Sequence, residues 1–203
     1  MNTFLGASQF LPESALDRDL IASGAILYLE GYLWDPEEPR KAMRAAIDVA
    51  RAAGRKVAFT LSDVFCISRH RADFVRLMDD GLVDILFANE NEILSLCETE
   101  DFEAAVAATA ARVPVLVVTR SEKGAIAISG GERVAARGEP IAEVVDTTGA
   151  GDLFAAGFLH GQAQGYDLAR SLRMGAICAA EIISHYGARP EVDLKELVER
   201  KLA

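Results

Sequence analysis

A short glycine-rich segment carries an acid into the start of a predicted helix. It reads Asp146-Thr147-Thr148-Gly149-Ala150-Gly151-Asp152. Backbone N–H groups at a helix start, with the positive end of the helix dipole behind them, bind phosphate and other oxyanions. Because glycine has no Cβ, the backbone at Gly149 and Gly151 can turn tightly and a ligand oxygen can come close. Asp152 lies beside this predicted anion site and is placed to accept a proton from an attacking hydroxyl group.

The same segment also has an ordinary structural explanation. An Asp in the first turn of a helix complements the helix dipole, and glycine before a helix is common as a turn. Taken alone, a short glycine-rich motif with an acid is compatible with both explanations.

Two further polar loops follow predicted strands. Asn89, with Glu92 three residues later, forms a capping box, which by itself serves only helix geometry. The second loop runs from Thr119 to Gly124 and, taken alone, is a polar turn. Ligands of open α/β sheets bind beyond the carboxyl ends of the strands, which is where we expect both loops and the Asp146 segment.

The elements that must position these loops alternate along the chain. Short apolar runs predict strands buried on both faces, at Ala25–Leu29, Lys56–Thr60, Val83–Ala88 and Val115–Thr119. Helical stretches between them are predicted at about Glu37–Ala53, Ser68–Asp80 and Phe102–Arg112, with Gly54 and Gly81 as stops. The alternation predicts an α/β fold of three layers, αβα, with a mostly parallel sheet.

The pattern changes after Thr119. Two short runs, Gly124–Ser129 and Arg133–Ala136, flank Gly130-Gly131 and predict an antiparallel hairpin at one sheet edge. Helices are again predicted at about Ala150–Gln164, Leu168–Ser184 and Leu194–Leu202. No repeat, low-complexity tract or linker divides the chain, so we expect a single domain over residues 1–203.

Composition excludes several classes of function. The chain has 203 residues, 51% of them hydrophobic, and a net charge of −10. Such a charge repels nucleic acid and acidic membranes, so we expect neither as a partner. The opening residues Met1–Gly6 show neither the basic region nor the long apolar region of a signal peptide, and no apolar run has membrane-spanning length. Three widely spaced cysteines fit reduced thiols, so we expect a cytoplasmic protein. The three histidines show no zinc-site spacing.

The longer string from Asp146 to Phe158 resembles the C-terminal signature of the ribokinase-like carbohydrate and nucleoside kinases, also called the phosphofructokinase B type. The resemblance implies a ribokinase-like fold, ATP as phosphoryl donor and Mg²⁺ as cofactor. It implies that Asp152 is the catalytic base and that the amides of Gly149, Ala150 and Gly151 hold the transferring phosphoryl group. Asp146 and Thr148 are the corresponding candidates for contact with a metal ion.

The family resemblance extends to the other loops. Asn89 and Glu92 resemble its N-x-x-E motif, whose Glu organises Mg²⁺ largely through water; Asn89 would lie near the nucleotide. The loop at Thr119 resembles T-x-G-x-x-G, which packs along the nucleotide, although Ser121 replaces the first glycine. This implies nucleotide contacts from Thr119, Ser121, Glu122 and Gly124, and from Ala176 beside the adenine ring.

The segment His185–Pro190 bears on the cofactor and the acceptor. In ribokinases it can bind a monovalent cation, whereas adenosine-kinase-like members need not use one, and we do not predict one here. Leu29–Asp35 and Gly187–Pro190 resemble bacterial adenosine-kinase-like proteins, which favours a nucleoside acceptor. The alternatives are a sugar kinase of the ribose, fructose or ketodeoxygluconate type, or a catalytically silent nucleotide-binding fragment.

The resemblance covers only the later part of the family's fold. Its members begin with strands, a small β lid and acceptor-binding loops, before the part that resembles Met1–Leu5. We therefore expect an N-terminally truncated chain in which the lid and first strands are absent. Missing strands would expose a sheet edge, so we also expect a homo-oligomer or self-association.

Overall fold

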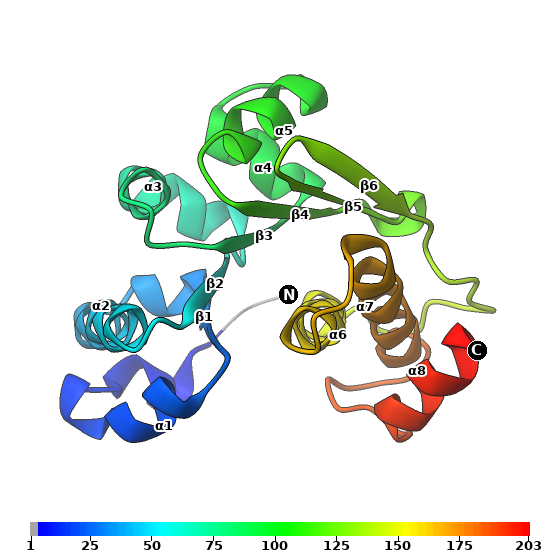
Figure 1. Ribbon diagram of the computed structural model, residues 1–203, viewed down its shortest axis with the longest axis horizontal. Helices are drawn as coiled ribbons and strands as arrows, with labels where there is room; N and C mark the ends of the chain where they lie inside the picture. Colours follow the sequence, from blue (N-terminus) through cyan, green and yellow to red (C-terminus); the bar gives the residue numbers. More distant parts are fainter. Residues whose placement is uncertain (1–3) are drawn as a thin grey trace. The chain divides into compact units, whose positions relative to one another are not determined.

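The computed structural model describes residues 4–203 (Figure 1). The chain divides into two compact units, Met1–Val117 and Val118–Ala203. Six strands follow one another in a single sheet in the order β1-β2-β3-β4-β5-β6. The expectation of a single domain over residues 1–203 stays a prediction.

Parallel strands form the centre of the first unit. They are β1 (Ile26–Glu30), β2 (Lys56–Thr60) and β3 (Ile85–Asn89), and β4 (Val115–Thr119) follows at the end of the unit. The strand predicted from Val83 begins two residues later. The side-chain carboxylate of Asp84 accepts a hydrogen bond from the backbone N–H of Val57 at 2.7 Å. Asp84 therefore contacts β2 through its side chain just before β3 begins.

Helices connect these strands. The α-helices are α1 (Arg18–Ser23), α2 (Glu37–Ala52), α3 (Val64–Asp79), α4 (Glu90–Cys97) and α5 (Phe102–Ala110). Short 3-10 helices occur at η1 (Gly6–Phe10), η2 (Glu13–Ala15) and η3 (Gly31–Trp34). The predicted stops at Gly54 and Gly81 are confirmed, because both adopt positive φ, 69° and 66°.

The start of α3 was predicted four residues too late, at Ser68. The carboxylate of Asp63 instead caps the helix by accepting from the backbone N–H of Phe65 at 2.6 Å. The helix then bends at His70, whose φ and ψ are −125° and 15°. The three short helices before β1 were not predicted, since none has the length that makes a helical period visible.

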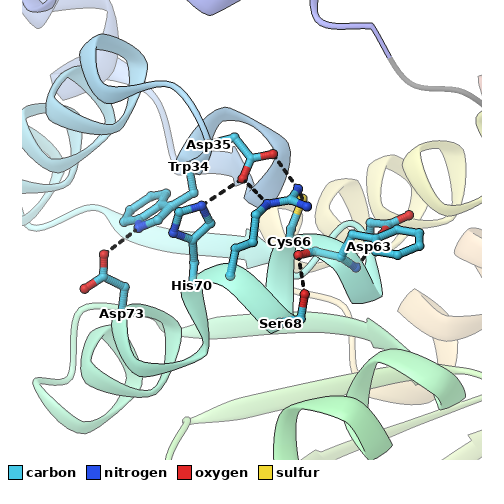
Figure 2. Close-up of polar contacts among 9 residues, drawn as sticks. Trp34, Asp35, Asp63, Cys66, Ser68, His70 and Asp73 are labelled. Atoms are coloured by element: carbon cyan, nitrogen blue, oxygen red, sulfur yellow. Dashed lines mark hydrogen bonds and ion pairs between the residues drawn. The ribbon is translucent and has the colours of Figure 1, made fainter.

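A polar cluster joins η3 to α3 (Figure 2). Trp34 is fully buried, packs edge-on against Phe59, and donates its indole N–H to Asp73 at 3.2 Å. Asp35 accepts two hydrogen bonds from Arg69, at 2.8 and 2.6 Å. The ring nitrogen Nε2 of His70 lies 2.8 Å from the same carboxylate. These contacts fix the chain that leaves β1 against α3.

A hairpin and three helices form the second unit. The antiparallel strands β5 (Ala125–Ser129) and β6 (Glu132–Ala136) confirm the predicted hairpin. The helices are α6 (Ala150–Ala163), α7 (Leu168–Ile182) and α8 (Leu194–Leu202). Together with the parallel strands, this confirms the predicted α/β fold with a mostly parallel sheet and antiparallel strands at its edge.

Glycines let α6 and α7 approach each other closely (Figure 1). A Cβ atom at Gly157 of α6 would lie 2.7 Å from the carbonyl oxygen of Met174. A Cβ at Gly175 of α7 would lie 2.8 Å from the carbonyl oxygen of Phe154. Both distances are shorter than van der Waals contact, so the contact between these helices requires glycine at both positions.

The three cysteines are free thiols. Burial is the largest cause that raises the pKa of both Cys66 and Cys178 to about 11, which fits packing residues. Among residues 4–203, no helix is long and apolar enough to cross a membrane.

Candidate functional site

The carboxylate of Asp146 organises the glycine-rich loop. Its Oδ1 accepts from the backbone N–H of Thr148 at 2.9 Å and from the Thr148 hydroxyl at 2.7 Å. Its Oδ2 accepts from the backbone N–H of Gly187 at 3.2 Å. Three hydrogen bonds hold the pKa of Asp146 below its usual range. The largest effect comes from the Thr148 side chain, followed by the backbone N–H groups of Thr148 and Gly187. Asp146 is therefore an ionised residue that shapes the loop.

Two glycines leave the backbone at the start of α6 accessible to a ligand. Gly149 is the N-cap of α6 in the left-handed conformation, with φ 82°. A Cβ atom built on Gly151 would meet no heavy atom within 4 Å, so a ligand can approach the backbone there. The N–H of Ala150 donates to the carbonyl of Thr147 at 3.2 Å, so the phosphoryl contact predicted for this amide would compete with that bond and stays a prediction. Within residues 4–203, no acceptor is bonded to the N–H groups of Gly149, Gly151 or Asp152.

Asp152 lies in the first turn of α6 and is exposed to solvent. It therefore sits in the same turn as the open amides, as predicted from its spacing. An anion held by those amides would have a carboxylate beside it that can accept a proton. This combination of donors and a base at one helix start is the arrangement needed for transfer of an anionic group to a hydroxyl.

The loop after β4 turns tightly. Ser121 has φ 50°, a left-handed conformation that favours glycine. Glu122 lies in the short 3-10 helix η4 (Ser121–Lys123). Gly124 has φ 87°, and a Cβ there would lie 2.1 Å from the carbonyl oxygen of Ala136. The backbone of Gly124 thus lies directly against the end of β6, and the predicted nucleotide contacts of Thr119 and of this loop stay predictions.

Asn89 and Glu92 form the predicted capping box at the start of α4, in the first unit. Glu92 accepts from the Asn89 backbone N–H at 2.9 Å and from the Asn89 side-chain amide at 2.7 Å. The Glu92 side chain is buried, and burial raises its pKa to about 7. A carboxylate at this pKa changes charge near neutral pH, which a capping role alone does not require.

Ala176, predicted beside the adenine ring, lies on α7 and is only 7% exposed. Its contact with a nucleotide stays a prediction. Among the described residues, no group of three or more His, Cys, Asp or Glu side chains could hold a metal ion.

One candidate residue was missed from the sequence. Phe65 is 71% exposed, in the first turn of α3, soon after the carboxyl end of β2. A large exposed aromatic ring at this end of a sheet, where ligands of α/β folds bind, is a candidate stacking surface. The available signal was the apolar pair Val64-Phe65 directly after the cap Asp63, where a solvated first turn would carry polar residues.

Comparison with known proteins agrees with this geometry. Residues 1–194 match the pfkB family of carbohydrate kinases. The chain belongs to this family. The pfkB match takes in the loops at Asn89, Thr119 and Asp146, and confirms the resemblance drawn from them.

Relatives within the pfkB family act on different acceptors. The chain is 29% identical to 5-dehydro-2-deoxygluconokinase of Shouchella clausii, over 96% of this chain and 63% of the relative. It is 36% identical to fructoselysine 6-kinase of Escherichia coli, over 68% of this chain and 48% of the relative. The crystal structure of adenosine kinase from Sinorhizobium meliloti is 43% identical, with a TM-score of 0.93, over 96% of this chain and 59% of that one. The chain thus spans less than two thirds of the length of these relatives.

Proposed function

We propose that the chain transfers the γ-phosphoryl group of ATP to a primary hydroxyl of a nucleoside or sugar. The observation that carries this proposal is the start of α6, where open amides and the exposed carboxylate of Asp152 share one turn. Membership of a kinase family supports it.

In this mechanism the amides of Gly149 and Gly151 hold the oxygens of the transferring phosphoryl group. The dipole of α6 adds a positive potential at the same place. The acceptor oxygen forms a bond to phosphorus while the bond to the bridging oxygen of ADP breaks, and the acceptor proton moves to Asp152. Positioning and charge stabilisation dominate such transfers, so a weak base is sufficient.

The donors on this chain fit a magnesium ion that keeps most of its water. Each oxygen of Glu92 accepts one hydrogen bond, so lone pairs remain for a bound water molecule. Glu92 and, near the phosphates, Asp146 and Thr148 are the proposed residues. When bound, Mg²⁺ neutralises charge on the phosphate oxygens.

For the acceptor we propose a nucleoside in preference to a simple sugar. The similarity to the S. meliloti adenosine kinase supports this choice. The sugar-kinase alternative is supported by the relatives that act on gluconate and fructose derivatives. A phosphotransfer screen over adenosine, cytidine, ribose, fructose and ketodeoxygluconate separates the two classes.

Replacement of Asp152 tests the assignment of the base. In the chain, and in any longer polypeptide that contains it, Asp152→Asn should lower kcat by about 10²–10⁴-fold because the proton acceptor is lost. Glu196→Gln is the matched control, because Glu196 is an exposed acid in the first turn of α8. An Asp152→Asn variant with the full kcat would remove Asp152 from the mechanism.

A second candidate is a nucleotide-binding module without catalytic activity. The chain spans less than two thirds of the length of its relatives, so the activity of those whole proteins does not by itself carry over to it. Calorimetry with Mg-ATP and with adenosine, measured separately, distinguishes the candidates. Binding of ATP without adenosine supports the module, binding of both supports the kinase, and binding of neither excludes a nucleotide site in this chain.

We also propose a cytoplasmic location, since ATP is the proposed donor, and self-association through the edge of the sheet at β1. This strand stands at one end of the strand order. An edge strand can pair with a second copy of the chain.

A further inference from the structure

The segment that follows α7 forms the surface on which the glycine-rich loop lies. The backbone N–H of Val145 donates to the carbonyl of Ile183 at 2.9 Å. Asp146 is the next residue of the loop, and its carboxylate accepts from the backbone N–H of Gly187, four residues after Ile183, at 3.2 Å. Gly149 lies so close to the next residue of the segment, Ala188, that a Cβ there would be 3.1 Å from the Ala188 methyl group. The conformation of the loop therefore depends on where residues 183–188 are held.

The carboxylate of Glu181 holds this segment at two points. The Glu181 side chain is 7% exposed. Its Oε1 lies 3.2 Å from Nε2 of His185 and accepts from the backbone N–H of Glu191 at 2.8 Å. One carboxylate oxygen thus ties together the beginning and the end of residues 185–191. Gly187 and Ala188 lie between these two ties.

The ring of His185 is almost fully engaged. Its side chain is 13% exposed, and Nδ1 lies 3.3 Å from the carbonyl oxygen of Tyr186. With Nε2 at a carboxylate and Nδ1 at a carbonyl, both ring nitrogens face acceptors, which is the environment of a doubly protonated ring. Burial alone would lower the pKa of His185, but the Tyr186 carbonyl and the carboxylates of Glu181 and Glu191 outweigh it and raise the pKa.

Acidic groups surround this ring from each neighbouring segment. Glu181 approaches from α7, and the carboxylate of Glu191 lies 3.9 Å from Nδ1. Across the glycine-rich loop, the charge on His185 also helps to lower the pKa of Asp146. The second oxygen of Glu181 is buried and has no hydrogen-bond partner within residues 4–203. His185 is therefore the group that compensates the charge of this buried acid.

We propose that the Glu181–His185 pair is a latch that positions the glycine-rich loop for phosphoryl transfer. The pair fixes residues 185–191, Gly187 and Ala188 then fix Asp146 and Gly149, and the open amides at the start of α6 take their positions from Gly149. His185 is a positioning residue, since it reaches the reacting atoms only through the backbone of this segment. The kinetic consequence rests on the proposed function, whereas the effect on loop structure does not.

Hydrogen exchange of the loop amides tests the latch without any assay of activity. In His185→Ala, the hydrogen-bonded amides of Val145, Thr148 and Gly187 should exchange about tenfold faster, since a charge-assisted contact that holds their partners is lost. His160→Ala is the matched control, because His160 is an exposed histidine on α6. Unchanged exchange at all three amides would overturn the proposal.

His185→Ala is judged unfolded if the amides of the β5–β6 hairpin exchange fast in addition to the loop amides. A second variant tests the latch in that outcome. Glu181→Gln keeps an acceptor for His185 and Glu191 but removes the charge. In this variant the loop amides should exchange faster than in the unaltered protein, while the exchange of the hairpin amides should not change. An equal change in exchange rate for loop and hairpin amides would contradict the latch.

Kinetics then separate this inference from the proposed function. Where phosphotransfer is measured, His185→Ala should lower kcat about tenfold, with the KM for ATP within about twofold of the unaltered protein, because misplaced amides affect the transition state most. If loop exchange is faster in His185→Ala but the unaltered protein shows no phosphotransfer, the kinase proposal alone is contradicted. If His185→Ala shows normal phosphotransfer and unchanged loop exchange, the latch alone is contradicted.

Discussion

Ser121 is a single residue at which this chain departs from the loop it resembles. A serine at φ 50° is strained relative to glycine, which the resembled loop carries at this position. Replacing it with glycine should therefore raise the free energy of unfolding by about 1 kcal/mol. Removal of the side chain should also strengthen ATP binding, because the backbone can approach the phosphates more closely.

Denaturant titration and calorimetry measure these two effects of Ser121→Gly. Ser129→Gly is the control, since Ser129 lies in β5 without positive φ and a glycine there should be destabilising. A loss of stability in Ser121→Gly as large as in the control would show that Ser121 is not strained.

The backbone contact of Gly124 leads to a second prediction at the residue scale. Gly124 and Gly131 have nearly the same φ, 87° and 84°, but only Gly124 has backbone atoms where a Cβ would be placed. Gly131→Ala should cost about 1–2 kcal/mol of folding free energy from conformational strain alone. Gly124→Ala should cost more than about 4 kcal/mol, because the end of β6 must also move. Equal losses in urea titrations would mean that the clash is relieved without cost.

Among the elements, α4 combines a structural and a titratable role. Glu92, the third residue of α4 and a member of its capping box, has a pKa raised by burial to about 7, so the folded state binds a proton that the unfolded state releases near pH 4.5. The sign follows from proton linkage: this stabilisation is complete below pH 4.5 and is lost as the pH rises through about 7. The contribution of Glu92 should fall by up to about 3 kcal/mol over this window.

Glu92→Gln isolates this contribution, because glutamine keeps an acceptor for the Asn89 backbone but does not titrate. The difference in free energy of unfolding between the variant and the unaltered protein should increase in favour of the variant from pH 5 to pH 8. Chemical denaturation at several pH values measures it, and a difference independent of pH would show that Glu92 is not titrating in this range.

Most element positions could be predicted from local patterns. Strands β2 and β4 and helix α8 have the predicted bounds. An apolar run or a helical period can be recognised in the sequence within a few residues. The early start of α3 could not be predicted in this way. Its apolar first turn, Val64-Phe65, looks like a continuation of buried chain until the cap from Asp63 is known.

For the molecule as a whole, charge and the sheet edge act in opposite directions. The net charge of −10 keeps copies of the chain apart at low salt, whereas pairing at the β1 edge would bring them together. The weight-average mass at micromolar concentration should therefore exceed that of the monomer and rise with ionic strength. Sedimentation equilibrium at about 0.05 and 0.5 M salt measures this, and a monomer at both would exclude edge pairing.

The loops of the candidate site could be located from the sequence, but the contacts that hold them in place could not. The loops at Asn89, Thr119 and Asp146 carry local motifs, so a reader of the sequence can find them. The bond between Gly187 and Asp146 joins residues 41 positions apart. Neither residue has a local pattern that selects the other, so such long-range contacts appear only when the chain has folded.

The close contact between α6 and α7 has a consequence for surveys of sequence tolerance. Gly157 and Gly175 cannot accept a side chain without separating two helices, one of which carries Asp152 in its first turn. A saturation mutagenesis library selected for activity would therefore be depleted at these glycines as strongly as at the anion-binding turn itself. Depletion alone would suggest that they take part in the reaction, although the structure shows them as the residues that let two helix backbones come into contact.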